Sequence, residues 1–256
     1  MPGPLLLGLD LGGGGIRCLV VDSDGGACTS ASRPLIARPQ PDAPMSAVFA
    51  PEEVWGGLRE AVGEALASAG SAPDAVAGIA STSMRHASAL LDADGHALAL
   101  TSNRDARGLA TMLELATENG AEWHRQTGHW PHPVQPAGRL RWIQREAPQL
   151  AERVVSALAL SDWLAFRLCG ERATDPTQAC ESLVFEIASA TWAPDLIQRL
   201  GIPAAWFPPV RASGSRLGSL SATAAAELGL RAGTPVAVGG ADTQCALLAA
   251  GVITPG

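Results

Sequence analysis

Four consecutive glycines near the start of the chain separate two short apolar runs, and an acidic residue precedes them. The apolar runs cover residues 5–11 and 16–21, the acid is Asp10, and the glycines are Gly12, Gly13, Gly14 and Gly15. Consecutive glycines let the backbone adopt positive φ and bring several N–H groups close to one anion. The segment therefore predicts a turn that cradles phosphate, with a carboxylate on the side where a metal ion would bind.

The residues after the glycines select among the possible phosphate-binding turns. A dinucleotide fingerprint needs another glycine at position 17 and then a helix, but Arg17 stands there and a strand-like run follows. A P-loop needs a lysine, and the 18 lysine-plus-arginine residues of this chain are all arginine. A glycine turn inside a β-hairpin remains, and an ordinary hairpin turn without a ligand is its alternative.

Composition limits the partners of the chain. With 256 residues, 47% of them hydrophobic, it can form one large or two small domains around a real core. A net charge of -7 argues against general binding to nucleic acid or anionic membranes. No apolar run approaches the roughly 18 residues of a membrane span, and the amino terminus lacks a basic leader region. We expect a soluble, cytoplasmic protein with no nucleic-acid or membrane partner.

Cysteine and histidine positions do not predict a metal centre. The five cysteines are widely spaced and include no Cys-x-x-Cys pair, so neither a disulfide framework nor a zinc site is expected. Three histidines, His124, His129 and His132, cluster near two tryptophans, but prolines interrupt the segment and the spacing is not that of one helix face. We expect no metal ligation by these histidines.

Hydrophobic periodicity predicts an opening antiparallel meander, followed by alternating strands and helices. The strands expected after the hairpin cover residues 27–36, 76–82, 87–91, 154–160 and 235–238. The expected helices cover residues 51–69, 105–118, 138–145, 161–169, 191–200 and 221–228. The proline-rich segment 34–51 is expected to cross the surface, and residues 123–136 have no clear pattern. This order predicts an α/β layered domain.

A second motif of glycines and an acid lies near the far end of the chain. The strand predicted at residues 235–238 is followed by Gly239, Gly240, Ala241 and Asp242. Asp10 and Asp242 are thus both expected at the carboxyl ends of buried strands, where ligands bind in open α/β sheets. An acid at a helix start can also be an ordinary capping residue, which is the alternative for Asp242.

Five segments together resemble the FGGY family of carbohydrate kinases. They are the glycine hairpin and residues 78–86 (GIASTSMRH), 103–107 (NRDAR), 161–164 (SDWL) and 232–242 (AGTPVAVGGAD). The resemblance covers essentially the whole chain in the family's order and spacing, and it is strongest to autoinducer-2 kinases, with xylulokinases further off. It implies an α/β fold of the ribonuclease H-like, actin-like ATPase class, a mixed sheet with helices on both faces.

The resemblance also implies the residues of an ATP and Mg²⁺ site. Asp10 matches the acid that faces magnesium-bound phosphates, and it is expected to hold Mg²⁺ through water. The residues implied in cofactor binding are Asp10, Gly12, Gly13, Gly14, Gly15, Arg17 and Gly240. Where the family usually has Thr or Ser hydroxyls, this loop has Gly13–15 and offers backbone donors alone.

On the acceptor side, the resemblance implies a general base and three substrate-binding residues. Asp242 matches the carboxylate that takes the proton from the attacking hydroxyl of a small sugar or polyol. Arg85 and His86 match the pair that contacts substrate hydroxyls, and Asp105 lies in a segment lining the same pocket. The alternatives are a surface ion pair between Arg85 and Asp105 and a structural role for His86. A glutamate stands at the position of His86 in autoinducer-2 kinases.

Members of the family are roughly twice as long as this chain. The resemblance therefore implies an amino-terminal domain over residues 1–251 and the start of a linker at 252–256, leading to an absent carboxy-terminal domain. We expect the isolated domain to be inactive and a homodimer to be possible. A sugar-binding or regulatory module without catalysis is the alternative function, and an actin-like or chaperone-type ATPase would leave the segment at residues 84–86 unexplained.

Overall fold

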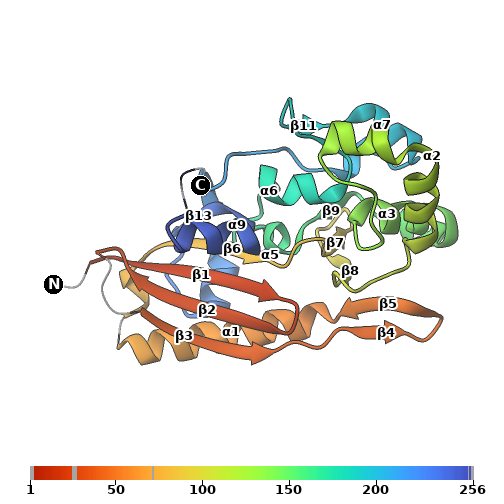
Figure 1. The fold of residues 1–256 in the computed structure, drawn as a ribbon. Helices are drawn as coiled ribbons and strands as arrows, with labels where there is room; N and C mark the ends of the chain where they lie inside the picture. The colour runs from red at the N-terminus through yellow and green to blue at the C-terminus, as the bar shows by residue number, and fades with distance from the viewer. Residues whose placement is uncertain (1–2, 25–27, 71, 253, 255–256) are drawn as a thin grey trace.

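The computed structural model describes residues 3–24, 28–70, 72–252 and 254, and its elements form two connected sheet regions with helices packed against them (Figure 1). A six-stranded sheet has the order β12-β13-β6-β1-β2-β3, and a five-stranded sheet has the order β4-β5-β8-β7-β9. A short ladder joins β10 to β11. The predicted mixed α/β architecture is confirmed, because β6 is parallel to β1 and β13 while β1, β2 and β3 form the antiparallel meander.

The elements of the chain have the following bounds. The strands of the large sheet are β1 (Leu5–Gly12), β2 (Gly15–Asp22), β3 (Cys28–Pro34), β6 (Val76–Ser83), β12 (Arg216–Ser219) and β13 (Pro235–Ala241). The other strands are β4 (Arg38–Gln40), β5 (Ala43–Phe49), β7 (Ser88–Leu91), β8 (Ala97–Thr101), β9 (Ser156–Leu158), β10 (Phe185–Glu186) and β11 (Thr191–Trp192). The α-helices are α1 (Pro51–Ala69), α2 (Leu109–Thr127), α3 (Pro136–Glu146), α4 (Pro148–Ala151), α5 (Leu160–Cys169), α6 (Pro176–Ala179), α7 (Pro194–Arg199), α8 (Ala222–Leu228) and α9 (Asp242–Ala249). Three 3₁₀ helices cover Pro73–Ala75, Cys180–Ser182 and Ala204–Trp206.

One face of the large sheet carries the main core. Alternate residues of β1 point to it, and the four leucines there are at most 6% exposed: Leu5, Leu7, Leu9 and Leu11. Helix α1 packs on β2 and β3, α5 packs on β13 and β6, and α8 contacts both helices. The proline at the start of α1 and the left-handed Gly70 at its end set the length of that helix.

The opposite face of the sheet carries α9 near the carboxyl ends of β6 and β13 (Figure 1). Sγ of Cys245 in α9 approaches Gly240, and the residue also hydrogen-bonds Thr82, which points away from α5. Helices therefore lie on both faces, as predicted. On the uncovered part of this face, Leu6 and Leu19 are 43% and 40% exposed.

The second sheet corrects the prediction for the proline-rich segment. Residues 34–51 were expected to cross the surface, but β4 and β5 form an antiparallel hairpin there, and β5 continues onto β8. Proline has no N–H group to donate, which hid the strands, although proline is tolerated at edge strands such as β4. A second apolar cluster lies among β7, α2, α3 and α7 and includes Leu90, Met112 and Trp123.

Several predicted boundaries also differ. Helix α2 begins four residues later than expected and runs on through Trp123, with a non-helical residue at Asn119. The helix expected at 191–200 is a short strand followed by α7, and the strand expected at 154–160 is reduced to β9. The first residue of the expected strand 27–36 and most of the expected linker lie outside the described residues. Within the described part of the chain, none of the helices is both long and apolar enough to span a bilayer.

Candidate functional site

The carboxyl ends of three neighbouring strands form the edge where the two predicted acids meet. Strand β6 lies between β1 and β13 and is parallel to both, and Ser83 is the register partner of both Leu11 and Ala241. Asp10 and Asp242 each adjoin this row, so their strands are two spacings, or about 10 Å, apart. The prediction that both acids reach one edge of the sheet is confirmed.

Asp10 is half-buried, and one of its two carboxylate oxygens is hydrogen-bonded. Its Oδ2 accepts a hydrogen bond from Nη1 of Arg17 at 2.7 Å, whereas its buried Oδ1 has no partner among the described residues. Burial raises the pKa of Asp10, Arg17 opposes this rise, and the charge of Asp242 adds to it. A buried carboxylate oxygen without a partner fits Mg²⁺ or a water bound to it, because Mg²⁺ prefers carboxylate and water oxygens.

The glycine turn closes the hairpin beside Asp10. A Cβ atom at Gly12 would lie 2.9 Å from Nη1 of Arg17, and one at Gly15 would lie 3.1 Å from the carbonyl oxygen of Arg33. A larger residue at Gly12 would displace the flexible end of the Arg17 side chain, and one at Gly15 would press on the backbone of β3. None of residues 12–15 has φ in the left-handed region, so the positive φ predicted for the glycines is wrong, whereas their N–H contacts with an anion stay a prediction.

The tip of the turn, Gly13–Gly14, faces open space. No atom lies within 4 Å of a Cβ at Gly14, and Sδ of Met84 is 4.0 Å from one at Gly13. Nη2 of the exposed Arg104 donates to the Gly13 carbonyl oxygen at 3.5 Å, and the Arg17 side chain is 58% exposed. Two cationic side chains thus border a turn with room for an anion, which is the chemistry that phosphate requires.

Asp242 begins α9 but does not cap it. The N-cap residue is Ala241, and Oδ1 of Asp242 accepts hydrogen bonds from N and Oγ1 of Thr243 at 2.7 and 3.3 Å. A capping carboxylate bonds the N–H groups two or three residues further on, so the capping alternative is wrong. Asp242 is half-buried at the sheet edge, where a ligand can reach it.

Gly240, predicted to contact the cofactor, is surrounded by protein atoms. A Cβ there would lie 3.3 Å from both Sγ of Cys245 and Oγ1 of Thr177. The carbonyl oxygen of Gly240 accepts a hydrogen bond from Oγ1 of Thr82 at 2.8 Å. Packing therefore explains the glycine, and its contact with a cofactor stays a prediction.

Arg85 and His86 converge on one buried glutamate, Glu181. Nη1 of Arg85 lies 3.1 Å from Oε1 of Glu181, and Nε2 of His86 lies 2.8 Å from Oε2. Burial acts to raise the pKa of Glu181, but His86 and then Arg85 hold it below its ordinary value. The Arg85 side chain is 40% exposed, so this pair presents hydrogen-bond donors that are already oriented.

His86 also has an unusual backbone. Its φ is 66°, in the left-handed region that non-glycine residues rarely adopt, at a cost of about 1–3 kcal/mol. The buried Arg139 donates to the His86 carbonyl oxygen and so holds this conformation. Burial lowers the pKa of Arg139 to about 10, which leaves the guanidinium charged at neutral pH. His86 therefore has a structural partner and faces a cavity at once.

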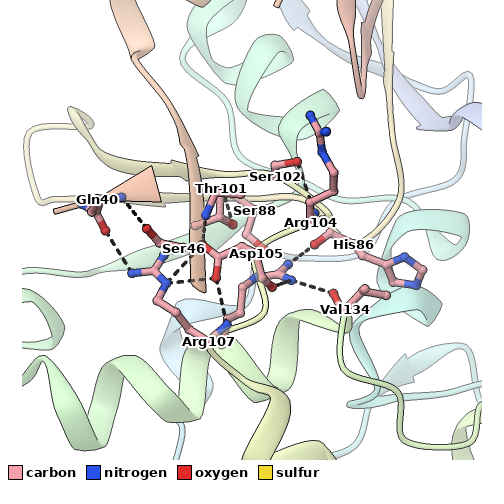
Figure 2. Close-up of polar contacts among 12 residues, drawn as sticks. Gln40, Ser46, His86, Ser88, Thr101, Ser102, Arg104, Asp105, Arg107 and Val134 are labelled. Atoms are coloured by element: carbon pink, nitrogen blue, oxygen red, sulfur yellow. Dashed lines mark hydrogen bonds and ion pairs between the residues drawn. The ribbon is translucent and has the colours of Figure 1, made fainter. Parts of the chain in front are cut away.

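Asp105 is fully buried. Figure 2 shows its hydrogen bonds and ion pair with other residues. Its Oδ2 lies 2.7 Å from Nη2 of Arg107 and also accepts from N of Ala47 at 3.1 Å. The Arg107 guanidinium reaches on to Gln40. The proposed surface pair with Arg85 is wrong, since both residues have other partners. A direct contact between Asp105 and substrate stays a prediction.

His129 lies close to Cys180 and to Glu181, the glutamate that contacts Arg85 and His86. Ligand atoms of His129, Cys180 and Glu181 lie within 4.8 Å of one another, close enough to hold a metal ion. However, both oxygens of Glu181 already face the side chains of Arg85 and His86. These side chains repel a cation, and we assign none to this group.

Beside His86 lies a cavity of about 40 Å³ whose wall includes the buried Asp162. Burial raises the pKa of Asp162 from 3.8 to about 8, and the hydrogen bond with Thr174 lowers it only in part. Oδ2 of Asp162 accepts from N of Ala159 at 3.3 Å at the start of α5. Asp162 is thus a carboxyl group that is mostly protonated at neutral pH.

The raised pKa predicts that stability falls with pH. Between about pH 4 and pH 8 the folded state keeps a proton on Asp162 that the unfolded state has lost, so the free energy of unfolding decreases as pH rises through this window. In Asp162→Asn, which cannot titrate, we expect a smaller decrease over the same range. Urea unfolding of both proteins at several pH values measures it. The exposed Asp74, changed to Asn, is the control. Equal slopes for wild type and Asp162→Asn would contradict the prediction.

Sequence reasoning missed three residues of this region: Asp175, Thr177 and Glu181. Asp175 is the N-cap of α6, and the order Asp-Pro before the helix is a recognisable start signal. Glu181 had no such signal, because its ion pair joins residues 96 positions apart. Pairing over that distance follows from the fold and not from local pattern.

Comparison with known proteins agrees with this geometry. The N-terminal domain of the FGGY family of carbohydrate kinases matches residues 5–249. An autoinducer-2 kinase of Photorhabdus laumondii is 31% identical over 99% of this chain, and one of Escherichia coli K12 is 33% identical over 98%. Each alignment covers 48% of the relative, so the chain spans about half the length of the curated relatives it matches.

A solved structure of a xylulose kinase has the same fold as this chain. The xylulose kinase of Rhodospirillum rubrum superposes with a TM-score of 0.90 at 30% identity, over 98% of this chain and 52% of that one. The predicted actin-like ATPase class is confirmed by this likeness, as is the predicted resemblance to autoinducer-2 and xylulose kinases. The predicted roles of individual residues stay predictions.

Proposed function

We propose a function from the premise that this chain belongs to the FGGY family of carbohydrate kinases. The chain is the amino-terminal lobe of an enzyme that uses ATP to phosphorylate a hydroxyl group of a small sugar or polyol. The observation that carries the proposal is the single sheet edge shared by Asp10, the glycine turn and Asp242. Phosphoryl transfer depends mainly on positioned groups and neutralised charge. This edge offers both.

On the acceptor side, Asp242 acts as the general base. Its half-buried carboxylate is oriented by Thr243, and it takes the proton of the attacking hydroxyl. Arg85 and His86, held by Glu181, donate hydrogen bonds to sugar hydroxyls. Asp105 supports this pocket from behind, because Nη1 of Arg139 bonds its carbonyl oxygen as well as holding His86.

On the nucleotide side, backbone N–H groups of Gly13 and Gly14 bind the terminal phosphates of ATP. Arg17 adds a positive charge, and Asp10, whose buried Oδ1 has no partner among the described residues, would hold Mg²⁺. When bound, Mg²⁺ would supply positive charge that neutralises the phosphates. Gly12 and Gly15 leave room for the Arg17 side chain and for the backbone of β3 beside the turn.

A second lobe completes this site. Helix α9 has no buried residue, and three apolar residues in and after it, Leu247, Leu248 and Val252, are 47%, 66% and 57% exposed. Apolar side chains gathered at the edge of a site mark an interface. The relatives are about twice as long as this chain, which supports a carboxy-terminal lobe as the partner. We expect a cytoplasmic enzyme, and homodimerisation stays a prediction.

The names of the relatives give two candidate acceptors, autoinducer-2 and xylulose. Autoinducer-2 kinases and a xylulose kinase are similar to this chain at comparable identity. The alternative function is a sugar-binding or regulatory module without catalysis. The turn tip favours that alternative, because Gly13 and Gly14 carry no hydroxyl group to reinforce phosphate binding.

A substrate panel tests the proposal. The two-lobed protein, meaning this chain joined to its carboxy-terminal lobe, is mixed with Mg²⁺–ATP and with pentuloses, hexonates, polyols or autoinducer-2. ADP release is then measured for each. We expect at least one acceptor to stimulate ADP release well above the rate without acceptor. Sugar binding by calorimetry with no stimulation by any acceptor would favour the non-catalytic module.

A further inference from the structure

A short and partly buried helix, α6, packs against β13, the strand that leads to Asp242. Its N-cap residue, Asp175, is fully buried, and its carboxylate accepts four hydrogen bonds. The donors are N of Thr177 at 2.9 Å, Oγ1 of Thr177 at 2.6 Å, N of Gln178 at 3.1 Å and Oγ of Ser213 at 2.7 Å. Asp175 is therefore fixed by its surroundings and cannot turn toward a ligand.

The hydroxyl group of Thr177 links the fixed Asp175 to Ala241, the residue before Asp242. Because Oγ1 of Thr177 donates its only proton to Asp175, its lone pairs are left to accept. The N–H group of Ala241 donates to this oxygen at 2.8 Å. Ala241 ends β13 and caps α9, so the bond fixes the backbone where the chain turns from strand to helix. The direction of the Asp242 side chain is set at this turn.

The same helix also anchors the strand end that leads to Arg85. Nε2 of Gln178 donates to O and Oγ of Ser83 at 3.3 and 3.1 Å. Glu181, just beyond the helix, holds Arg85 and His86. Residues 175–181 thus contact both sides of the site, and no ligand contact is needed to explain their arrangement.

We propose that Asp175 and Thr177 are positioning residues that hold Asp242 in its working orientation, an inference that rests on the proposed kinase function. A general base must lie within hydrogen-bond reach of the hydroxyl it deprotonates, and a misplacement of about 1 Å can cost about 100-fold in rate. One hydroxyl group that is itself locked by a buried carboxylate provides the needed rigidity. Thr177 therefore acts on Asp242 through the backbone of Ala241 and has no contact with the substrate.

Thr177→Val tests the bond with a nearly unchanged side-chain shape. In the two-lobed protein, we expect kcat to fall about 10- to 100-fold while KM for the sugar stays within about twofold. Thr177→Ser, which restores the hydroxyl, should recover most of kcat. Thr29→Val is the matched control, since Thr29 donates to the Ala65 carbonyl oxygen at 3.0 Å on the far helix α1. Equal losses in Thr177→Val and Thr29→Val would overturn the proposal, as would an unchanged kcat in Thr177→Val.

A second measurement needs no turnover. In this chain alone, we expect the Ala241 amide to exchange its hydrogen faster in Thr177→Val than in wild type or Thr177→Ser, and the carboxyl-carbon NMR signal of Asp242 to move. Unchanged exchange and an unmoved signal would overturn the positioning role even if kcat falls. If the wild-type two-lobed protein transfers no phosphate, the proposed kinase function fails, and these two signals still decide whether Thr177 sets the geometry at Asp242.

Discussion

This chain alone is expected to release ADP from ATP at least about 10³-fold more slowly than the two-lobed protein, even with sugar present. The reason is that the sheet edge with Asp10 and Asp242 lies open on one side. The Arg17 side chain is 58% exposed, and no residue of α9 is buried. Enzymes that close over their substrates exclude water and align the reacting groups, and alignment alone is worth about 10⁵-fold or more in effective concentration. One lobe cannot close on itself.

A coupled assay of ADP release, run on both proteins at equal concentration, measures the difference. Circular dichroism and calorimetry of sugar binding are the controls, because they show that the single lobe is folded and still recognises the acceptor. Substantial sugar-dependent ADP release by this chain alone would contradict the need for a second lobe. It would also mean that the exposed leucines of α9 have a different partner.

Asp242→Asn in the two-lobed protein is expected to lower kcat by about 10²- to 10⁴-fold, the usual contribution of a general base. The amide has nearly the same shape, and its oxygen can still accept the Thr243 N–H bond that the carboxylate accepts now. It cannot take a proton from the acceptor. Sugar binding should therefore stay within about threefold, because Arg85, His86 and Glu181 are unchanged.

The matched control is Asp74→Asn, at an exposed acid just before β6 and thus at the opposite edge of the sheet. Steady-state kinetics gives kcat, and calorimetry gives sugar affinity for each variant. A kinase loses turnover in Asp242→Asn and keeps it in Asp74→Asn. A regulatory module would be indifferent to both changes. Loss of sugar binding in Asp242→Asn would instead assign Asp242 to substrate recognition.

Sequence patterns were sufficient for the parts of the site that are local in the chain. Glycines between two apolar runs predicted the hairpin, and an acid at the carboxyl end of each strand placed Asp10 and Asp242 at one edge. The reason for the glycines was not predictable, since the clash of a Cβ at Gly12 with Arg17 depends on a side-chain position. The backbone there needs no left-handed conformation.

Contacts between distant segments were beyond sequence reasoning. Glu181 holds Arg85 from 96 residues away, and Thr177 reaches Ala241 from 64 residues away. Likewise, the carboxylate of the buried Asp105 accepts a hydrogen bond from N of Ala47, 58 residues away. Each case depends on how the second sheet and α6 pack against the first, and no local periodicity encodes that packing.

The most direct test asks whether sugar and nucleotide meet at one sheet edge. The amide NMR signals of this chain can be followed while Mg²⁺–ATP and the acceptor sugar are added separately. We expect the nucleotide to shift the amides of Gly13 and Gly14, the sugar to shift those of Arg85 and His86, and both ligands to shift the amides of residues 241–243. Shifts confined to separate surfaces, with residues 241–243 unaffected by either ligand, would contradict phosphoryl transfer at this edge.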